Sequence, residues 1–247
     1  GGSGGGAVTR GTTPMKTRAL CALALSTATV AQAADVKFFT EDYAPYNYVE
    51  NGELTGHGVD IINEALSRSG VSAEMEVTKW SRAITLAEQD ANTCVFTTAR
   101  TPEREDRFNW AGPMYSEAIY LIQKPGANGD VTSVEQALTK KVGTQTGDFA
   151  VALLDRLGAS DIDLAPDAEM TLKKLGAGRV DYMVALESAA AVAIEEGGFE
   201  IAMEISRNEF FLACSKTTDE SVIARMDEAI DSILADGTQE AFVAKYD

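Results

Sequence analysis

Two arginines follow an apolar, β-branched segment in the sequence FTTARTPERE, residues 96–105. Arg100 and Arg104 are cations in a chain that has 38 Asp and Glu residues against 21 Lys and Arg residues. A guanidinium group is always charged and can bind a carboxylate through two parallel hydrogen bonds. Backbone amides at a Thr-Pro helix start would add partial positive charge beside Arg104. The segment predicts either a binding site for a negatively charged group or a structural arginine that pairs with nearby acidic residues.

The surrounding sequence must supply the elements that hold these arginines in place. Short apolar runs alternate with amphipathic stretches, which is typical of an α/β fold with parallel strands. A turn-rich break at 125–130 separates two such series, so the chain is predicted to form two similar α/β halves with boundaries near residues 123 and 210. Strands are expected at 36–40, 72–78, 93–98, 116–124 and 209–216, and helices at 59–70 and 80–90 in the first series.

The amino end of the chain has a different composition. Residues 1–14 are rich in Gly, Ser and Thr without an apolar period, so we interpret them as an appended linker. Residues 15–34 begin with Met15, carry two basic residues before an apolar run, and end in Ala-Gln-Ala-Ala. This order predicts a secretory signal peptide with cleavage near Ala33 or Ala34. A transmembrane anchor is the alternative, but the apolar run is too short to span a bilayer.

The net charge excludes several classes of partner. Residues 1–34 hold three of the 21 basic residues and no acidic ones, so the remainder has 18 Lys and Arg against 38 Asp and Glu, a formal charge of −20. A nucleic-acid partner needs a basic surface, so none is expected. Adsorption to anionic lipid is excluded for the same reason. The acidity suits solubility and carries no information about the fold.

Cysteine and histidine usage bears on disulfides and metals. Cys94 and Cys214 remain after removal of the predicted signal peptide. In an exported protein such a pair suggests a disulfide, and two buried free thiols are the alternative. His57, between two glycines, is expected in a loop rather than as a metal ligand, and no Cys/His cluster has zinc spacing. We therefore expect neither a metal nor a cofactor.

Five segments occur in an order that resembles a known family. They are EDYAPYNYVENGELTGHGVDIINEAL, TKWSRAITLAEQD, TARTPERE, LKKLGAGRVDYMVAL and ILADGTQEAFVAKY. Together they resemble the periplasmic solute-binding proteins of ABC transporters that bind polar amino acids, extracellular solute-binding protein family 3. The resemblance covers the chain from Asp35 to Asp247 and implies the type II periplasmic binding protein fold. In that fold two α/β lobes, with parallel-type sheets, are joined by a two-strand hinge and hold the ligand in the cleft between them. Lobe 1 would comprise 35–122 plus 211–247, and lobe 2 would comprise 123–210.

The resemblance assigns roles to residues of the first lobe. Arg104 matches the arginine of the family's T-x-x-R turn, which grips the ligand's carboxylate, and Thr98 and Ala99 end the strand before this turn. Tyr43 and Trp80 match two aromatic positions of the cleft, where their rings could enclose a flat ligand or hold a cation. Core packing is the alternative for both rings, and it is the expected role of Tyr46, Tyr48 and Trp110. Arg100 has no such role and is expected on the surface or at the cleft edge.

In the second lobe, GTQTGDFA at 143–150 resembles the family's glycine turn, where backbone amides close over the carboxylate. Its candidate residues are Thr146, Gly147, Asp148 and Phe149. A helix N-cap is the alternative role of Asp148, and it does not exclude the site.

Two positions depart from the family's pattern. The Ser or Thr five residues before the carboxylate arginine is Ala99 here. The Asp that binds the ligand's α-ammonium corresponds to Leu186. Either Glu187, Glu41 or Asp42 replaces this Asp, or the ligand is not a standard α-amino acid.

The function implied by the resemblance is that of a binding protein rather than an enzyme. It would be a periplasmic monomer that delivers a small carboxylate-bearing solute, an amino acid or derivative, to an ABC permease in the inner membrane. One alternative is a sensory binding subunit. Another is a dehydratase-like enzyme on the same fold, for which Glu187 or Asp148 could serve as the acid.

Overall fold

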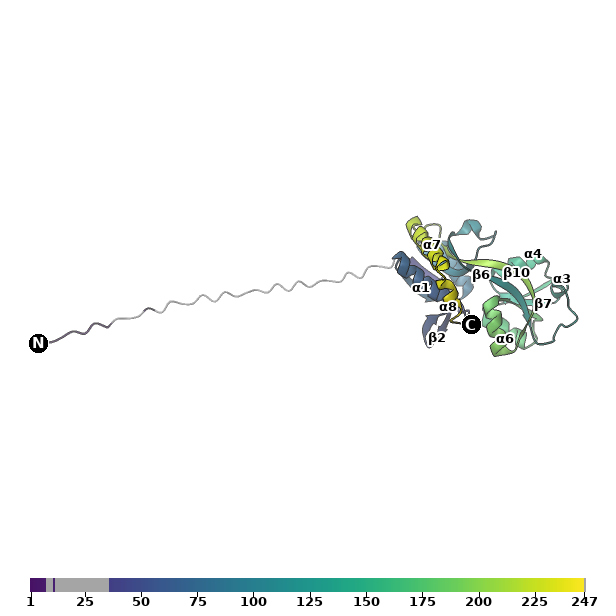
Figure 1. Ribbon diagram of the computed structural model, residues 1–247, viewed down its shortest axis with the longest axis horizontal. Coiled ribbons are helices and arrows are strands. Elements are labelled where there is room, and N and C mark those ends of the chain that lie inside the picture. The colour runs from purple at the N-terminus through teal and green to yellow at the C-terminus, as the bar shows by residue number, and fades with distance from the viewer. Residues whose placement is uncertain (8–10, 12–35, 247) are drawn as a thin grey trace. The chain divides into compact units, whose positions relative to one another are not determined.

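The computed structural model describes residues 1–7, 11 and 36–246 (Figure 1). The chain divides into two units, residues 1–33 and 34–247. In the first unit the described residues form no helix or strand, and the predicted signal peptide lies outside the described residues. Within the described part of the chain, no helix is both long and apolar enough to span a bilayer.

One mixed sheet organises the second unit. Its strand order is β4-β1-β5-β10-β6-β9-β7-β8, and a separate two-stranded sheet pairs β2 with β3. The strands at the two ends of the sheet pair in parallel, whereas β10 pairs antiparallel with β5 and β6, and β6 pairs antiparallel with β9. The strands are β1 (Val36–Thr40), β2 (Tyr48–Glu50), β3 (Glu53–Thr55), β4 (Ala73–Val77), β5 (Thr93–Ala99), β6 (Asn109–Gln123), β7 (Lys141–Gln145), β8 (Asp161–Ala165), β9 (Tyr182–Leu186) and β10 (Glu200–Cys214).

The prediction of two separate sheets is therefore wrong, because the structure has one continuous sheet across both halves. The α/β class and the two strands that cross between the halves are confirmed. The sheet is continuous because β6 and β10, each 15 residues long, stay hydrogen-bonded to each other through both halves. Both are longer than the predicted strands at 116–124 and 209–216. Residues 116–118 and 207–209 pair only with each other, since β5 ends its pairing at Phe210 and β9 begins its pairing at Ile119. This two-stranded stretch connects the halves.

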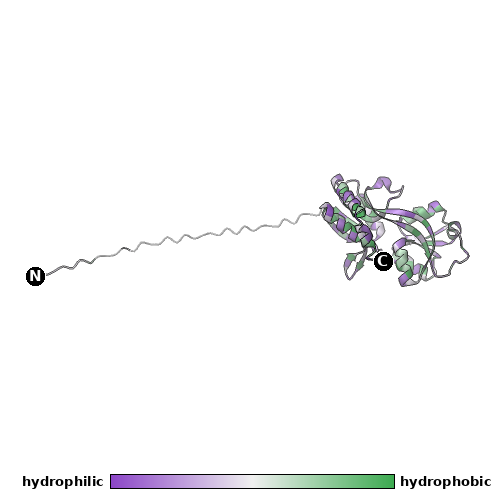
Figure 2. Ribbon diagram, viewed as in Figure 1, coloured by the Kyte–Doolittle hydropathy of each residue, from purple (hydrophilic) through white to green (hydrophobic). Residues whose placement is uncertain are grey.

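We call the part built on β4, β1 and β5 the first lobe and the part built on β9, β7 and β8 the second lobe. Figure 1 shows β6 and β10 between the helices of the two lobes. Figure 2 shows hydrophilic and hydrophobic residues alternating around α1 and α7, as expected for helices with one face on a core. The first-lobe helices are α1 (His57–Ser69), α2 (Trp80–Gln89), the 3-10 helix η1 (Glu105–Arg107), α7 (Glu220–Ala235) and α8 (Thr238–Val243). The second-lobe helices are α3 (Val134–Ala137), α4 (Phe149–Leu157), α5 (Ala168–Gly176) and α6 (Glu187–Gly197).

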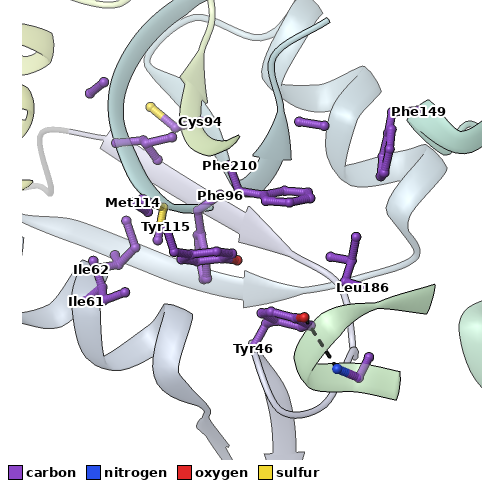
Figure 3. Close-up of a cluster of buried hydrophobic side chains, with 14 of the residues drawn as sticks. Tyr46, Ile61, Ile62, Cys94, Phe96, Met114, Tyr115, Phe149, Leu186 and Phe210 are labelled. Atoms are coloured by element: carbon purple, nitrogen blue, oxygen red, sulfur yellow. Dashed lines mark hydrogen bonds between the residues drawn. The ribbon is translucent and has the colours of Figure 1, made fainter. Parts of the chain in front are cut away.

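A column of aromatic rings lies in the core where the lobes meet. The rings of Tyr46 and Tyr115 stack with their centroids 5.6 Å apart, and Tyr115 stacks on Phe210 at 5.5 Å. Phe149 meets Phe210 edge-on at 6.0 Å. Figure 3 shows this column, with Leu186 near its end. Tyr46 is fully buried, which confirms its expected role in the core.

The two cysteines form a disulfide, so the free-thiol alternative does not hold. Cys94 and Cys214 face each other in the antiparallel ladder between β5 and β10, 120 residues apart in sequence. The prediction that His57 lies in a loop is wrong. His57 is the first residue of α1 and is buried, with its ring against Tyr46 and Tyr115.

Candidate ligand-binding site

A small cavity lies between the lobes, near the carboxyl ends of β1, β5, β7 and β9. We call it the inner pocket, and its volume is about 30 Å³. A cavity of this size holds about one or two water molecules, so a larger solute can enter only after the lobes move apart. The inner pocket is lined by Glu41, Tyr43, Trp80, Thr97, Ala99, Gln145, Asp148, Phe149, Val184, Leu186 and Phe210.

Arg104 lies in the turn between β5 and η1 and is only 5% exposed. Its Nη1 donates to the carbonyl oxygen of Ala99 at 3.2 Å, and its Nη2 donates to the carbonyl oxygen of Gly147 at 3.0 Å. Burial lowers the pKa of Arg104 to about 10, so the side chain keeps its charge at neutral pH. The buried guanidinium therefore reaches from the first lobe to the glycine turn of the second lobe.

Arg100 has a different environment from Arg104. It is exposed, pairs with Glu105, and its guanidinium lies over the ring of Trp110 at 5.6 Å. The indole of Trp110 in turn packs against Phe211. Arg100 thus lies on the surface as expected, away from the lining of the inner pocket.

Trp80 begins α2 and is buried. Its indole Nε1 donates to the carbonyl oxygen of Gly147 at 2.9 Å, and its ring lies 5.4 Å from the guanidinium carbon of Arg104. Gly147 has a φ of 78°, a backbone conformation that residues other than glycine rarely adopt. The glycine is thus required for the turn that places its carbonyl between the two donors.

Asp148 and Phe149 follow this glycine at the start of α4. Asp148 is the N-cap, because its carboxylate accepts a hydrogen bond from Ala150 N at 2.9 Å, and it also lines the inner pocket. Burial raises the pKa of Asp148, and the nearby charge of Arg104 opposes that rise. Thr146 is exposed and bonds to Ala165 instead. Of the four candidates in this turn, Asp148 and Phe149 line the pocket.

Glu41 and Gln145 form a polar pair across the lobes, and sequence reasoning had missed Gln145. The Nε2 of Gln145 lies 3.0 and 2.8 Å from the two carboxylate oxygens of Glu41. Burial, followed by the charge of Asp148, raises the pKa of Glu41 to about 8. The Oε1 of Gln145 is buried and has no hydrogen-bond partner among the described residues. The pocket wall therefore contains an acceptor without a donor, beside a carboxyl that is largely protonated at neutral pH.

Successive residues of β5 face opposite sides of the sheet, which separates Thr98 from its neighbours. Thr97 and Ala99 line the inner pocket, whereas Thr98 is buried and its hydroxyl donates to Val95 O at 3.1 Å. Thr97 has a φ of 60°, and its hydroxyl bonds to Asn47 at 2.6 Å. The alternation of side chains along the strand would have pointed to Thr97 in place of Thr98.

The same distinction separates Leu186 from Glu187. Leu186 lines the inner pocket, and its backbone N donates to the hydroxyl of Tyr43 at 3.3 Å. The carboxylate of Glu187 accepts from Ala118 N at 3.0 Å and lies 3.5 Å from Arg207, and its side chain is 47% exposed. The structure therefore places Glu187 at the connecting strands and outside the lining of the inner pocket. Of the three proposed substitutes for the missing Asp, Glu41 lines it.

Further contacts join the lobes around the pocket. Lys79 forms an ion pair with Asp167, and Arg156 forms one with Glu103. With the Gln145 and Gly147 contacts, these pairs show that the lobes are closed on each other.

A second, larger cavity of about 830 Å³ opens beside the inner pocket. We call it the outer groove. It shares Glu41, Tyr43 and Trp80 with the inner pocket and continues between α5 and α6.

The family model for bacterial extracellular solute-binding proteins, family 3, matches residues 37–246. The chain belongs to this family. Because the match covers both lobes and the connecting strands, it confirms the expected family and the solute-binding class of the protein.

Individual relatives are similar along most of the chain. The L-cystine-binding protein TcyJ of Escherichia coli (strain K12) is 23% identical over 210 residues, which cover 83% of this chain and 79% of that protein. An ancestral arginine-binding protein solved with arginine superposes with a TM-score of 0.77 at 21% identity, covering 85% of this chain and 97% of the other. The ancestral amino acid-binding protein AncCDT-1, a precursor of cyclohexadienyl dehydratase, superposes with a TM-score of 0.76 at 21% identity, covering 85% and 94%. These structures share the two-lobed type II periplasmic binding protein fold.

Proposed function

We propose that the protein is a periplasmic receptor that captures an amino acid or a derivative between its lobes and delivers it to an ABC permease. The observation that carries the proposal is the position of Arg104, a buried cation beside the inner pocket with a bond to each lobe. The names of relatives support the ligand class, since TcyJ binds L-cystine and the ancestral protein was solved with arginine.

The carboxylate of the ligand is assigned to Arg104. Two contacts to carbonyl oxygens use part of its five N–H donors, so others stay available for a carboxylate. When the lobes open, the bond to Gly147 breaks and frees a further donor. Tyr43 and Trp80 would flank the ligand, and Phe149 and Leu186 would close the apolar side of the pocket.

The ammonium of the ligand is assigned to Glu41 and Gln145. Leu186 cannot bind a cation, whereas the unpaired Oε1 of Gln145 accepts hydrogen bonds and Glu41 can ionise beside it. An ammonium group has three donors and suits both acceptors. This pair would replace the Asp that the family uses at the position of Leu186.

The remaining features follow from this assignment. We propose that residues 15–34 are a cleaved signal peptide and that the mature protein acts as a monomer in the periplasm. We propose that the lobes divide at residues 116–118 and 207–209, a few residues before the expected boundaries of 35–122 plus 211–247 and 123–210, because Ile119–Ile122 already pair with β9 of the second lobe. Closure around the ligand would then be a hinge motion at residues 116–118 and 207–209, which pair only with each other.

A dehydratase-like activity is the second candidate. Two carboxyls with raised pKa values, buried Glu41 and partly buried Asp148, share the pocket, which is an arrangement that enzymes use for acid catalysis. To test this candidate, the protein would be incubated with cyclic carboxylates and the dehydrated product would be measured. A catalytic turnover lost in Glu41→Gln would support an enzyme, and absence of product would leave the binding function.

The proposed function is tested by thermal unfolding of the mature protein after bound solute has been removed by unfolding and refolding. The panel compares α-amino acids with matched acids that lack the amine and matched amines that lack the carboxylate. A ligand at about 1,000 times its dissociation constant adds about 4 kcal/mol to the free energy of unfolding. If only amino acids stabilise the protein, this supports the assignment of the ligand's carboxylate to Arg104 and of its ammonium to Glu41 and Gln145. Stabilisation by amine-free acids overturns the assignment of Glu41 and Gln145, and no stabilisation by any member overturns the proposed function.

A further inference from the structure

The outer groove has the size of a ligand site. Its volume of about 830 Å³ falls within the ~300–1,000 Å³ of typical small-molecule pockets, whereas the inner pocket is far smaller. Its floor is apolar and is formed by Ile122 of β6 together with Met183 and Ala185 of β9. Its walls come from α5 and α6, including Leu172 and Ala193, and from the first-lobe segments 41–44 and 77–80.

Small side chains of α6 line the groove. The helix has the sequence ESAAAVAIEEG, and Ala189 and Ala193 both line the groove. These two alanines are four residues apart and therefore lie on the same face of the helix. Larger residues there would fill the space between the helices, as side chains fill most protein interiors.

The charges at the groove are mostly negative. Asp42, Glu169 and Glu196 line it. Lys79, the single basic residue of the lining, pairs with Asp167, and Glu169 pairs with Lys173, so among the described residues Asp42 and Glu196 have no ion pair. A ligand in the groove would therefore be uncharged or cationic at its outer end, since like charges disfavour an anion.

The groove adjoins the inner pocket. Glu41, Tyr43 and Trp80 belong to the linings of both. In the inner pocket, next to Glu41, the buried Oε1 of Gln145 has no partner among the described residues and offers an acceptor for a ligand's N–H. A molecule held by this polar end would have its remaining atoms directed toward the groove.

We propose that the ligand is an elongated α-amino acid whose zwitterionic head occupies the inner pocket and whose apolar body lies in the outer groove. This inference rests on the proposed function, in which Arg104 binds the carboxylate of the ligand and Glu41 and Gln145 bind its ammonium. It adds the class of side chain, namely an extended apolar chain of several carbons without a negative charge.

The test uses straight-chain α-amino acids from alanine to 2-aminodecanoic acid, with dissociation constants measured by calorimetry on the mature protein. Each methylene buried in the groove should tighten binding about fourfold, from ~0.8 kcal/mol per CH₂. In Ala193→Leu the added side chain occupies the groove, so the gain per methylene should disappear. In Ala191→Leu, the same change on an exposed residue of α6 outside the groove lining, the gain should remain.

The outcomes separate the two proposals. If no amino acid of any length binds, the proposed function fails. If alanine binds and affinity does not rise with length, or if Ala193→Leu keeps the same gain per methylene as Ala191→Leu, only the elongated ligand is overturned. If Ala193→Leu does not fold, Val192→Phe takes its place, because Val192 also lines the groove and is partly exposed.

Discussion

Arg104 and Trp80 donate hydrogen bonds to the same carbonyl oxygen, that of Gly147. Both donors belong to the first lobe, and the acceptor belongs to the second. The guanidinium also lies over the indole ring, so the two side chains hold each other in place. Any separation of the lobes must break both bonds together, which links the proposed carboxylate anchor directly to closure.

Arg104→Ala should abolish ligand binding. Removal of one partner of a buried, hydrogen-bonded charge pair costs about 2–5 kcal/mol, so affinity should fall at least ~30-fold. Arg100→Ala is the matched control, because Arg100 pairs with Glu105 on the surface. Calorimetry with a verified ligand measures both. Equal affinity of Arg104→Ala and the wild type would remove Arg104 from the site.

Trp80 should report ligand binding by fluorescence. The protein has two tryptophans, and Trp110 bonds to Glu105 in the same lobe rather than across the lobes. We expect Trp110→Phe to keep the ligand-induced change in emission and Trp80→Phe to lose it. The opposite pattern would show that the cleft contact of Trp80 does not respond to the ligand.

Binding of an amino acid should release a proton from Glu41. In the free protein its pKa is about 8, and a ligand ammonium beside it would favour the ionised form. Affinity should therefore rise as the pH increases from 6 to 8, and calorimetry in buffers of different ionisation enthalpy should detect the released proton. Glu41→Gln should show neither effect. An unchanged pH dependence in this variant would place the ammonium elsewhere.

Stability of the unliganded protein should fall as the pH rises toward 8. A carboxyl with a raised pKa holds its proton longer in the folded state, so the unfolded chain binds fewer protons and the free energy of unfolding decreases with pH. Between pH 6.5 and 8 the loss from Glu41 should be about 1–2 kcal/mol. The buried His57, with a pKa of about 4, acts in the opposite direction but below this range. Urea unfolding of the wild type and Glu41→Gln measures the difference, and parallel curves would contradict it.

The disulfide should stabilise the fold without tuning the site. Cys94 and Cys214 are 120 residues apart in the sequence, and loss of such a bond typically costs about 2–5 kcal/mol. The double variant to alanine should unfold at lower denaturant concentration while ligand affinity stays within about twofold. A large loss of affinity would show that the bond also positions the pocket.

Much of the fold could be predicted because local patterns and tertiary structure agree. The strand at 36–40 has the predicted bounds, and the α/β alternation survives in both lobes. The continuous sheet could not be predicted. The expected strand at 116–124 covers the connecting residues, but nothing in it shows that the strand begins at Asn109 and stays paired with β10 through both lobes.

The position of a candidate site residue could be predicted where a motif determines both which residue is involved and which way its side chain points. Trp80 and Asp148 line the inner pocket, and Arg104 contacts Trp80 beside it; their role in ligand binding stays a prediction. Thr98 and Glu187 are each one residue away from the side chain that lines the pocket, and only the pleat of a strand or its end decides between such neighbours. The outer groove is lined by segments of both lobes, from Glu41 to Gly197, and no local pattern shows that these segments come together.

The disulfide of the first lobe also has a consequence for the order of folding. The lobe takes β1, β4 and β5 from the early part of the chain, but α7, α8 and the end of β10 from the last part. A polypeptide that emerges from its amino end must therefore hold Cys94 as an unpaired thiol until Cys214 follows it. The second lobe, encoded between the two cysteines, can complete its own strands β7, β8 and β9 before that moment. Oxidation at this pair can therefore follow the completion of the second lobe and precede the addition of α7 and α8, which come after Cys214.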